Sequence, residues 1–260
     1  MGQVPAATRT LRVLRFLATQ PEPVPLDRIA RACALPRSTA YHLLAAMIEE
    51  GFVVHLADEH RYGLGVAAFE VGSGFSRQEP LQRMSRRTLT DLVDHTGQSA
   101  HLAVLHGRDV LYVVEERAPG RPPLVTDVGV RLPAHLTASG RAILSALPAA
   151  QVRALYPDPS AFVDRHGTGP RTLSALRSLL SDTRRRGHAT EEGEVTPGLA
   201  SVAAPVLDHN GHPAAGLAIT YAVEESTTAD RLAEAVRRSA AALTKRLGGP
   251  DEPHVTSGPS

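Results

Sequence analysis

Apolar residues recur with the spacing of an α-helix in three short segments near the start of the chain. The first, TLRVLRFLAT, predicts a helix with arginines on its outer face and a buried stripe of Leu11, Val13, Leu14, Phe16 and Leu17. Three prolines between residues 21 and 25 end this helix, and LDRIARACA predicts a second, short one. Cys33, the only cysteine, is expected to be a small buried residue in the following turn.

The third segment, PRSTAYHLLAAMI, predicts a helix that starts near Pro36 and stops at Gly51. Its buried face is expected to hold Tyr41, Leu44 and Ile48, with Leu43 and Met47 beside them. FVVHL, a polar ADEH turn and RYGLG then predict a short hairpin with Arg61 near its tip. Three helices followed by a hairpin are typical of a winged helix-turn-helix, in which the front of the third helix meets base edges.

A connector follows between residues 66 and 95. Its pattern predicts two helical stretches divided around Gly72, Gly74 and Pro80, with Leu81, Met84, Thr88 and Leu92 buried. The two glycines are either a hinge or ordinary turn residues.

Strict alternation of apolar and polar residues returns in the second half of the chain. SAHLAVLHGRDVLYVVEER and SVAAPVLDHNGHPAAGLAITY each predict an antiparallel hairpin. Helical patterns lie between them at SGRAILSAL, AQVRALY and TLSALRSLLSDTRRRG, and a last helix starts near residue 227. Strands in hairpins with segregated helices predict an α+β fold. We expect a DNA-binding domain over residues 1–64, a helical linker over 65–85, an effector domain over 86–248 and a disordered tail over 249–260.

Composition places the chain among soluble globular proteins. It has 260 residues, 42% of them hydrophobic and 21% charged, and a net charge of +1. No apolar run approaches the roughly 18 residues of a membrane span, so we expect a cytoplasmic protein without membrane contact. Residues 1–64 carry seven arginines and six acidic residues, so positive charge must be segregated on one face if this segment binds DNA.

The chain resembles the IclR family of bacterial transcription regulators over roughly residues 8–247. The resemblance is carried by LDRIARACALPRSTAYHLLAAMIEEGFV with RYGLG, and by VGVRLPAHLTASGRAILSAL, RRRGHATEEGE and GLASVAAPVLDHNG. It implies a winged helix-turn-helix domain and a GAF-like effector domain. It also implies DNA contacts from Arg37, Ser38, Thr39 and Tyr41, and we expect further contacts from Arg9, His42 and Arg61. His42 departs from the family pattern, in which an arginine commonly follows the tyrosine.

The same resemblance implies an effector pocket. Its residues would be Leu132, Ala138, Ser139, Glu191, Leu199, Ser201, Ala218 and Thr220. Ser201 stands where many relatives have a cysteine, and Ala218 where some carry a hydroxyl. Free N–H groups at the helix start near Ser139 could take a carboxylate, so we expect a carboxylic acid metabolite as the effector.

Two other classes of function compete with this interpretation. His188, Glu191, Glu192 and Glu194, or His209 and His212, could build a metal site or an acid–base pair of an enzyme. However, the chain has no HExxH, GxSxG, phosphate loop or cysteine cluster, so we expect no catalytic residue, metal or cofactor. An interaction module with weakened DNA binding at His42 is the other alternative. The sequence therefore predicts a ligand-responsive repressor or dual regulator that binds a pseudo-palindromic double-stranded operator as a dimer or dimer of dimers.

Overall fold

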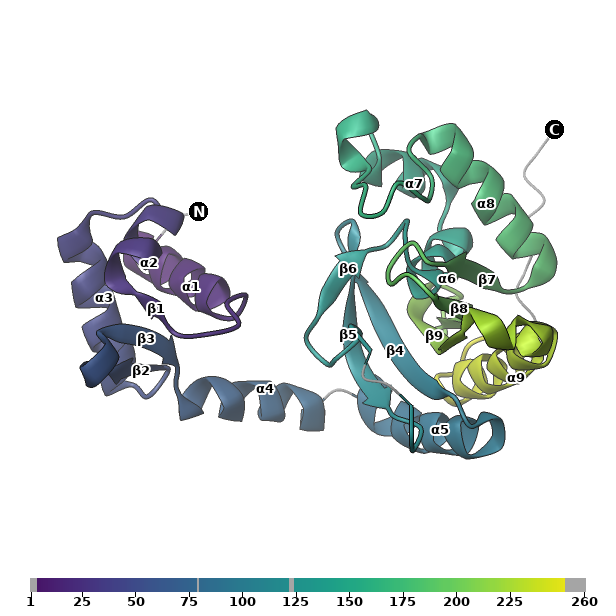
Figure 1. Cartoon of the computed structure of the whole chain (residues 1–260), viewed down its shortest axis with the longest axis horizontal. Helices are drawn as coiled ribbons and strands as arrows, with labels where there is room; N and C mark the ends of the chain where they lie inside the picture. The colour runs from purple at the N-terminus through teal and green to yellow at the C-terminus, as the bar shows by residue number, and fades with distance from the viewer. Residues whose placement is uncertain (1–3, 79, 122–123, 251–260) are drawn as a thin grey trace. The chain divides into compact units, whose positions relative to one another are not determined.

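The computed structural model describes residues 4–78, 80–121 and 124–250. It divides into two compact units, Met1–Glu79 and Pro80–Ser260, which are described separately (Figure 1). This division falls inside the segment that the sequence analysis assigned to a linker. Most of the tail expected to be disordered, residues 251–260, lies outside the described residues.

The first unit is a winged helix-turn-helix, as the sequence predicts. Its sheet has the antiparallel order β1-β3-β2, and β3 pairs with β2 from Leu64 opposite Val53 to Arg61 opposite Leu56. The elements are α1 (Pro5–Leu17), β1 (Val24–Pro25), α2 (Leu26–Ala32), α3 (Arg37–Glu49), β2 (Val53–Leu56), η1 (Ala57–Glu59), β3 (Arg61–Leu64) and α4 (Val66–Gln78). Cys33 is buried at the end of α2, as expected.

The buried face of α3 differs from the predicted one. Ala40, Leu44 and Met47 are buried, whereas Tyr41 is 55% and Ile48 37% exposed. The stripe is therefore rotated by about one residue, because the small Ala40 lies in the core. On α1 the prediction for Leu11 is also wrong: it is 60% exposed.

The predicted break in the connector is present at Pro80 and absent at the two glycines. Helix α4 continues through Gly72 and Gly74 to Gln78, and the next helix, α5, spans Pro80–Thr96. A Cβ atom built on Gly72 meets nothing within 4 Å, so no close packing requires a glycine there. Leu81 and Leu92 are buried as expected, and Met84 and Thr88 are partly buried.

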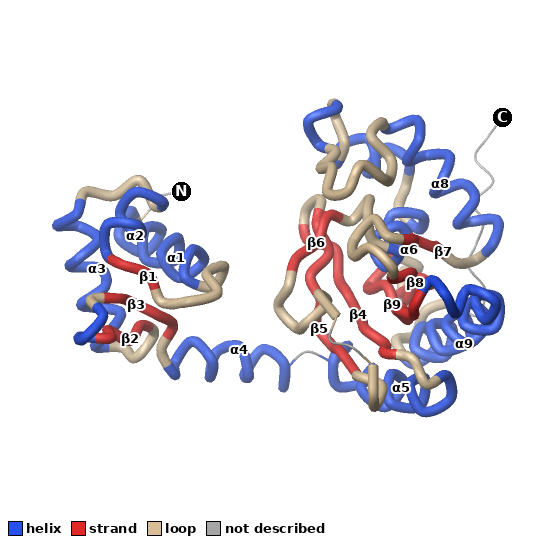
Figure 2. The backbone as a smooth tube through the Cα atoms, in the orientation of Figure 1, coloured by secondary structure: helices blue, strands red, loops and turns tan. Residues whose placement is uncertain are grey.

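The second unit is built on one antiparallel sheet of order β6-β5-β4-β9-β8-β7 (Figure 2). Both predicted hairpins are present, as β4 with β5 and β8 with β9, and together they form the middle of the sheet. The edge strands β6 and β7 are short and were not predicted. The strands are β4 (Ser99–His106), β5 (Asp109–Glu116), β6 (Arg131–Pro133), β7 (Ala189–Glu192), β8 (Leu199–Leu207) and β9 (Pro213–Ala222).

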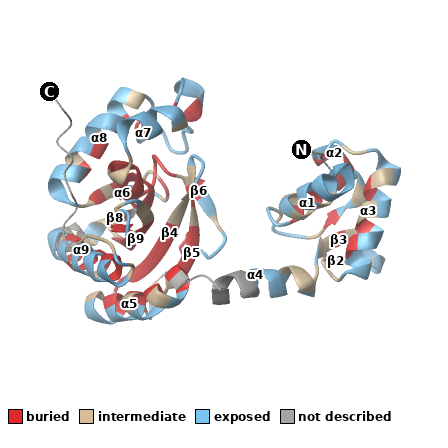
Figure 3. Ribbon diagram, turned by 180° about the vertical axis from the view of Figure 1, so that it is seen from behind, coloured by how far each residue is buried: buried red, intermediate tan, exposed pale blue. Residues whose placement is uncertain are grey.

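Helices cover both faces of this sheet, and its entirely antiparallel pairing confirms the α+β class. They are α6 (Ala138–Ala146), α7 (Ala149–Leu155), α8 (Leu173–Arg186) and α9 (Ala229–Arg246), with α5 and the short turns η2 (Pro159–Ala161) and η3 (Val223–Thr228). The predicted stop of α8 is confirmed, since Gly187 caps it in the left-handed conformation. Leu217 and Ile219 on β9 pack in the core with α5 and α9, and Ala218 between them packs with α6. Figure 3 shows the resulting buried strands between exposed helix surfaces.

Candidate functional site

The front of α3 presents polar side chains to solvent. The helix begins at Arg37 after an extended Pro36, and no side chain caps its first N–H groups. Arg37, Ser38, Tyr41 and His42 are exposed, and Thr39 is partly buried. The residues that the resemblance assigned to DNA therefore lie on the accessible part of this helix.

Arg37 and Arg61 of this unit form hydrogen bonds and ion pairs with different partners. Arg37 forms an ion pair with Asp27 of α2, and both side chains remain more than half exposed. Arg61 donates to the backbone oxygen of Pro23 over 3.0 Å and lies 3.9 Å from Glu59. Arg37 and the wing arginine Arg61 are thus both held by partners in their own domain, whereas Arg9 is exposed on α1.

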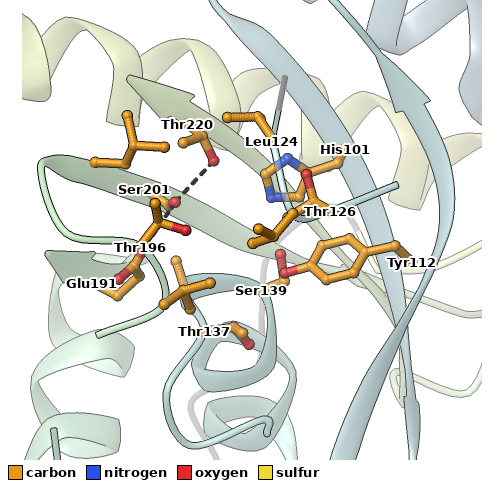
Figure 4. A pocket seen from close by; sticks show the side chains of 14 residues that line it. His101, Tyr112, Leu124, Thr126, Thr137, Ser139, Glu191, Thr196, Ser201 and Thr220 are labelled. Atoms are coloured by element: carbon orange, nitrogen blue, oxygen red, sulfur yellow. Dashed lines mark hydrogen bonds between the residues drawn. The ribbon is translucent and has the colours of Figure 1, made fainter. Parts of the chain in front are cut away.

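A hollow with about 350 Å³ of empty space, its mouth included, lies between the sheet of the second unit and the start of α6 (Figure 4). Its lining residues are His101, Tyr112, Leu124, Val125, Thr126, Thr137, Ala138, Ser139, Glu191, Val195, Thr196, Leu199, Ser201 and Thr220.

Strand register explains why three polar side chains gather on one wall of this hollow. Glu191 of β7 is paired with Ser201 of β8, which is paired in turn with Thr220 of β9, so all three share one face. Ser201 Oγ donates to Glu191 Oε1 over 2.9 Å and lies 2.9 Å from Thr220 Oγ1. Because the single Ser201 proton goes to Glu191, Thr220 is the donor in the second bond.

The opposite wall is the N-terminus of α6, which small residues hold against the sheet. A Cβ atom on Gly140 would lie 2.2 Å from the backbone oxygen of Ala134, and one on Gly216 2.5 Å from that of Ser139. Beneath the helix, Ala189, Ala203 and Ala218 form the next row of the sheet. Thr137 Oγ1 caps α6 by accepting from Gly140 N over 2.9 Å. Large side chains at these positions would push the helix away from the hollow.

A buried arginine ties the same helix to strand β7. The Arg141 side chain is 3% exposed and pairs with Glu194 at 2.8 Å. It also donates to the backbone oxygens of His135 over 2.9 Å and Thr190 over 2.7 Å. Each of the three guanidinium nitrogens therefore forms a hydrogen bond that holds a wall of the hollow in position. Arg141 itself does not line the hollow.

Burial shifts the proton equilibria of the groups in the hollow. It raises the pKa of Glu191 to about 8, and the neighbouring Glu194 adds to this effect. Burial lowers the pKa of His101 to about 4 and raises the pKa of Tyr112 well above its usual value. His101 is therefore neutral near pH 7, and the described lining contains neither lysine nor arginine.

The structure brings together six of the eight predicted effector residues: Ala138, Ser139, Glu191, Leu199, Ser201 and Thr220. Leu132 and Ala218 do not line the hollow. Leu132 is in the core around α8, and Ala218 lies under α6, which explains why a small residue stands there. The sequence analysis missed His101, Tyr112, Leu124, Val125, Thr126, Thr137, Val195 and Thr196. The strands that carry the first two, β4 and β5, were predicted, but their pattern does not tell which face borders the hollow.

The other clusters considered for chemistry are not assembled into a metal site. No group of three or more His, Cys, Asp or Glu side chains that could hold a metal occurs among the described residues. Within the same part of the chain, no helix is long and apolar enough to cross a membrane.

Comparison with known proteins agrees with both units. Residues 6–57 match the family model described as the IclR helix-turn-helix domain, and residues 76–245 match the bacterial transcriptional regulator IclR C-terminal model. The glycerol operon regulatory protein of Streptomyces coelicolor is 33% identical over 92% of this chain and 95% of its own. The transcriptional repressor IclR of Escherichia coli K12 is 29% identical over 95% of this chain and 92% of its own. These relatives are named as regulators and not as enzymes.

A solved structure shows the same fold. An IclR homologue from Microbacterium hydrocarbonoxydans, complexed with 4-hydroxybenzoate, is 21% identical with a TM-score of 0.80. The alignment covers 93% of this chain and 98% of that chain.

Proposed function

This chain belongs to the IclR family of bacterial transcription regulators, and we propose that it represses, or both represses and activates, transcription in response to a small carboxylic acid. The observation that carries the proposal is the pairing, in one chain, of an exposed polar helix front with a partly enclosed hollow lined by hydroxyl and carboxyl groups. The names of relatives, an acetate operon repressor of Salmonella typhimurium among them, support repression.

For DNA, α3 is proposed as the recognition helix. Arg37, Ser38, Thr39, Tyr41 and His42 would contact base edges and phosphates from its first turns. Arg9 on the exposed side of α1 would add a phosphate contact, and Arg61 would contact phosphate only after leaving Pro23 and Glu59. An arginine pairs well with guanine through two hydrogen bonds, so Arg37 is the residue on which specificity depends most.

For the effector, the start of α6 supports recognition of a carboxylate. The first N–H groups of a helix have no partner within the helix and carry partial positive charge, which favours an anion. Ala138 and Ser139 are in this position and line the hollow, together with the hydroxyls of Ser201 and Thr220. The Leu124, Val195 and Leu199 side chains would contact the apolar part of the ligand.

We also propose a homo-oligomer, a dimer or a dimer of dimers. Helix α4 exposes Val66 (72%), Phe69 (75%) and Val71 (61%), and such apolar surface is commonly covered by another subunit. Two copies related by a two-fold axis would read the two halves of a pseudo-palindromic operator. An effector that binds one arrangement of the copies more tightly would shift the equilibrium toward it.

The test uses the DNA upstream of the protein's own gene, with unlabelled random DNA as competitor, at several salt concentrations. Arg37→Ala should abolish specific binding and keep effector binding, and Ser201→Leu, which fills the hollow, should do the reverse. Arg153→Ala, at an exposed arginine of α7, is the matched control and should change neither. If Arg37→Ala binds the operator as tightly as the wild type, α3 is not the recognition helix. If the wild type binds no DNA specifically, an interaction module is the better interpretation.

A further inference from the structure

One oxygen of the hollow is left without a partner. The Glu191 side chain is almost completely buried, with the residue 5% exposed. Its Oε1 accepts the hydrogen bond from Ser201, but its Oε2 is buried and receives no hydrogen bond from a donor among the described residues. A carboxyl oxygen in this position costs free energy unless it carries a proton that it can donate or receives a bond from a ligand.

Among the described residues, no lysine, arginine or histidine forms an ion pair with this carboxyl group. Arg141 is the nearest arginine that influences it, but its guanidinium is already bonded to Glu194, His135 and Thr190. Glu194 raises the pKa of Glu191 both as a hydrogen-bond partner and as a second negative charge, so a bound acid competes with Glu194 for the Glu191 proton. From the rest of the hollow, Glu191 is faced by neutral His101 and by Tyr112, so these residues supply no positive charge.

We propose that Glu191 is protonated in the free protein and donates its Oε2–H to the carboxylate of the bound acid, so that two carboxyl groups share one proton in the hollow. This rests on the proposed function, since it concerns the same ligand site. Two ionised carboxylates cannot be held side by side in a buried site without a large penalty, and a shared proton removes that penalty. The high pKa of Glu191 that burial causes, about 8, agrees with this protonation state.

A protonated Glu191 restricts the chemical class of the ligand more than the N-terminus of α6 does. A ligand with an acceptor, such as a carboxylate or an amide oxygen, fits the Glu191 donor. An ammonium group would need Glu191 to be ionised and would bind better as the pH rises. Once the pH exceeds the pKa of Glu191, an acid must bring a proton with it, and its affinity should fall about tenfold per pH unit.

The protonation state can be measured without any ligand. Infrared spectra of the full chain at pH about 7 should contain a carboxylic acid C=O band that disappears in Glu191→Gln. Glutamine keeps the size of the side chain and the oxygen that accepts from Ser201, so the fold should be retained, which a thermal melt checks. Glu192→Gln, at the exposed neighbouring glutamate, is the matched control and should leave the band unchanged. If the wild type lacks the band, the proposal is wrong.

Donation to the ligand is tested by thermal shift with 4-hydroxybenzoate, pyruvate and acetate as acids, and 4-hydroxybenzylamine as the amine, from about pH 6 to about pH 9.5. The wild type should bind an acid below about pH 8 and lose affinity above it, whereas Glu191→Gln should bind that acid with no such loss. Binding of the amine in preference, increasing with pH, would overturn the proposal. If the infrared band is present but no acid binds at any pH, protonation stands, and acid recognition, with the proposed effector class, is refuted.

Discussion

Arg141 and Glu194 form an ion pair at 2.8 Å in which the arginine side chain is 3% and the glutamate 13% exposed. The pair joins α6, which forms one wall of the hollow, to the segment after β7, which forms another. Its further bonds to His135 and Thr190 fix the loop before α6 as well. The shape of the hollow therefore depends on a residue that does not line it.

Replacing this arginine should destabilise the second unit strongly. Arg141→Met leaves Glu194 and two backbone oxygens without their donor inside the protein, and breaking a buried pair in this way costs about 3–5 kcal/mol. Urea unfolding should show the loss as a lower midpoint. Arg153→Met, at an exposed arginine of α7, should change stability by less than about 0.5 kcal/mol. Equal midpoints for the two variants would show that the buried pair does not hold α6.

Gly140 is the second position at which the wall of the hollow can be moved. In Gly140→Ala the new Cβ would lie 2.2 Å from the oxygen of Ala134, so the loop or the helix must shift. Effector affinity should fall at least about tenfold, because a displacement of α6 moves the N–H groups proposed to bind the carboxylate. Calorimetric titration with an acid that the wild type binds measures this.

The same change at Gly72 provides the control. Gly72 is in the interior of α4 with open space around its Cβ position, so Gly72→Ala should raise stability by about 0.5–1 kcal/mol and leave effector affinity unchanged. An effector affinity of Gly140→Ala equal to that of the wild type would mean that α6 does not form the ligand-binding wall.

Much of the fold could be predicted because alternation and helical spacing are local properties of the chain. The hairpins around residues 107 and 210, and the stop of α8 at Gly187, follow from neighbours in the sequence. The face of α3 could not be predicted in the same way. Tyr41 and Ile48 have more apolar surface to bury than Ala40, but Ala40 is the completely buried residue, and a close-packed core can require a small side chain.

Only part of the lining of the hollow could be predicted from the sequence. Glu191, Ser201 and Thr220 are separated along the chain, and only the register of β7, β8 and β9 makes them neighbours. The resemblance to the IclR family identified these three residues, and the strand register explains why they lie together. Helices bury both faces of the sheet, so the pattern of β4 does not tell which face His101 shares with the hollow. Leu124 and Thr196 come from loops, which carry no periodicity.

His101 should make the protein sensitive to acid. Its pKa is lowered to about 4 in the folded chain, whereas an unfolded histidine titrates near 6.5. A depressed pKa means that the unfolded state binds more protons between these values, so stability is lost as the pH falls from about 6.5 to about 4. Between pH 7 and pH 5 this loss is about 2 kcal/mol for one such histidine.

The measurement is the difference between wild type and His101→Phe in urea unfolding at these two pH values. This comparison is needed because Glu191, with its raised pKa, acts in the opposite direction and gains stability as the pH falls from about 8. The variant should lose less stability on acidification than the wild type. His209→Asn, in the exposed turn between β8 and β9, should behave as the wild type does. A variant with the same acid sensitivity as the wild type would show that His101 does not titrate as its burial requires.

Phe69 is the position from which the proposed oligomer can be tested without disturbing a core. Its side chain is 75% exposed on α4, beside exposed Val66 and Val71, so Phe69→Asp should not unfold the first unit. A charge in an apolar subunit contact is costly, so the variant should elute as a monomer of 27.7 kDa by light scattering. At the same concentration the wild type should have at least twice that mass.

Because one domain has fewer phosphate contacts than two, Phe69→Asp should also bind the full operator at least about 100-fold more weakly. Glu70→Gln, at the exposed neighbouring residue, should retain the wild-type mass and affinity. If Phe69→Asp has the same mass as the wild type, the apolar surface of α4 is not the subunit contact.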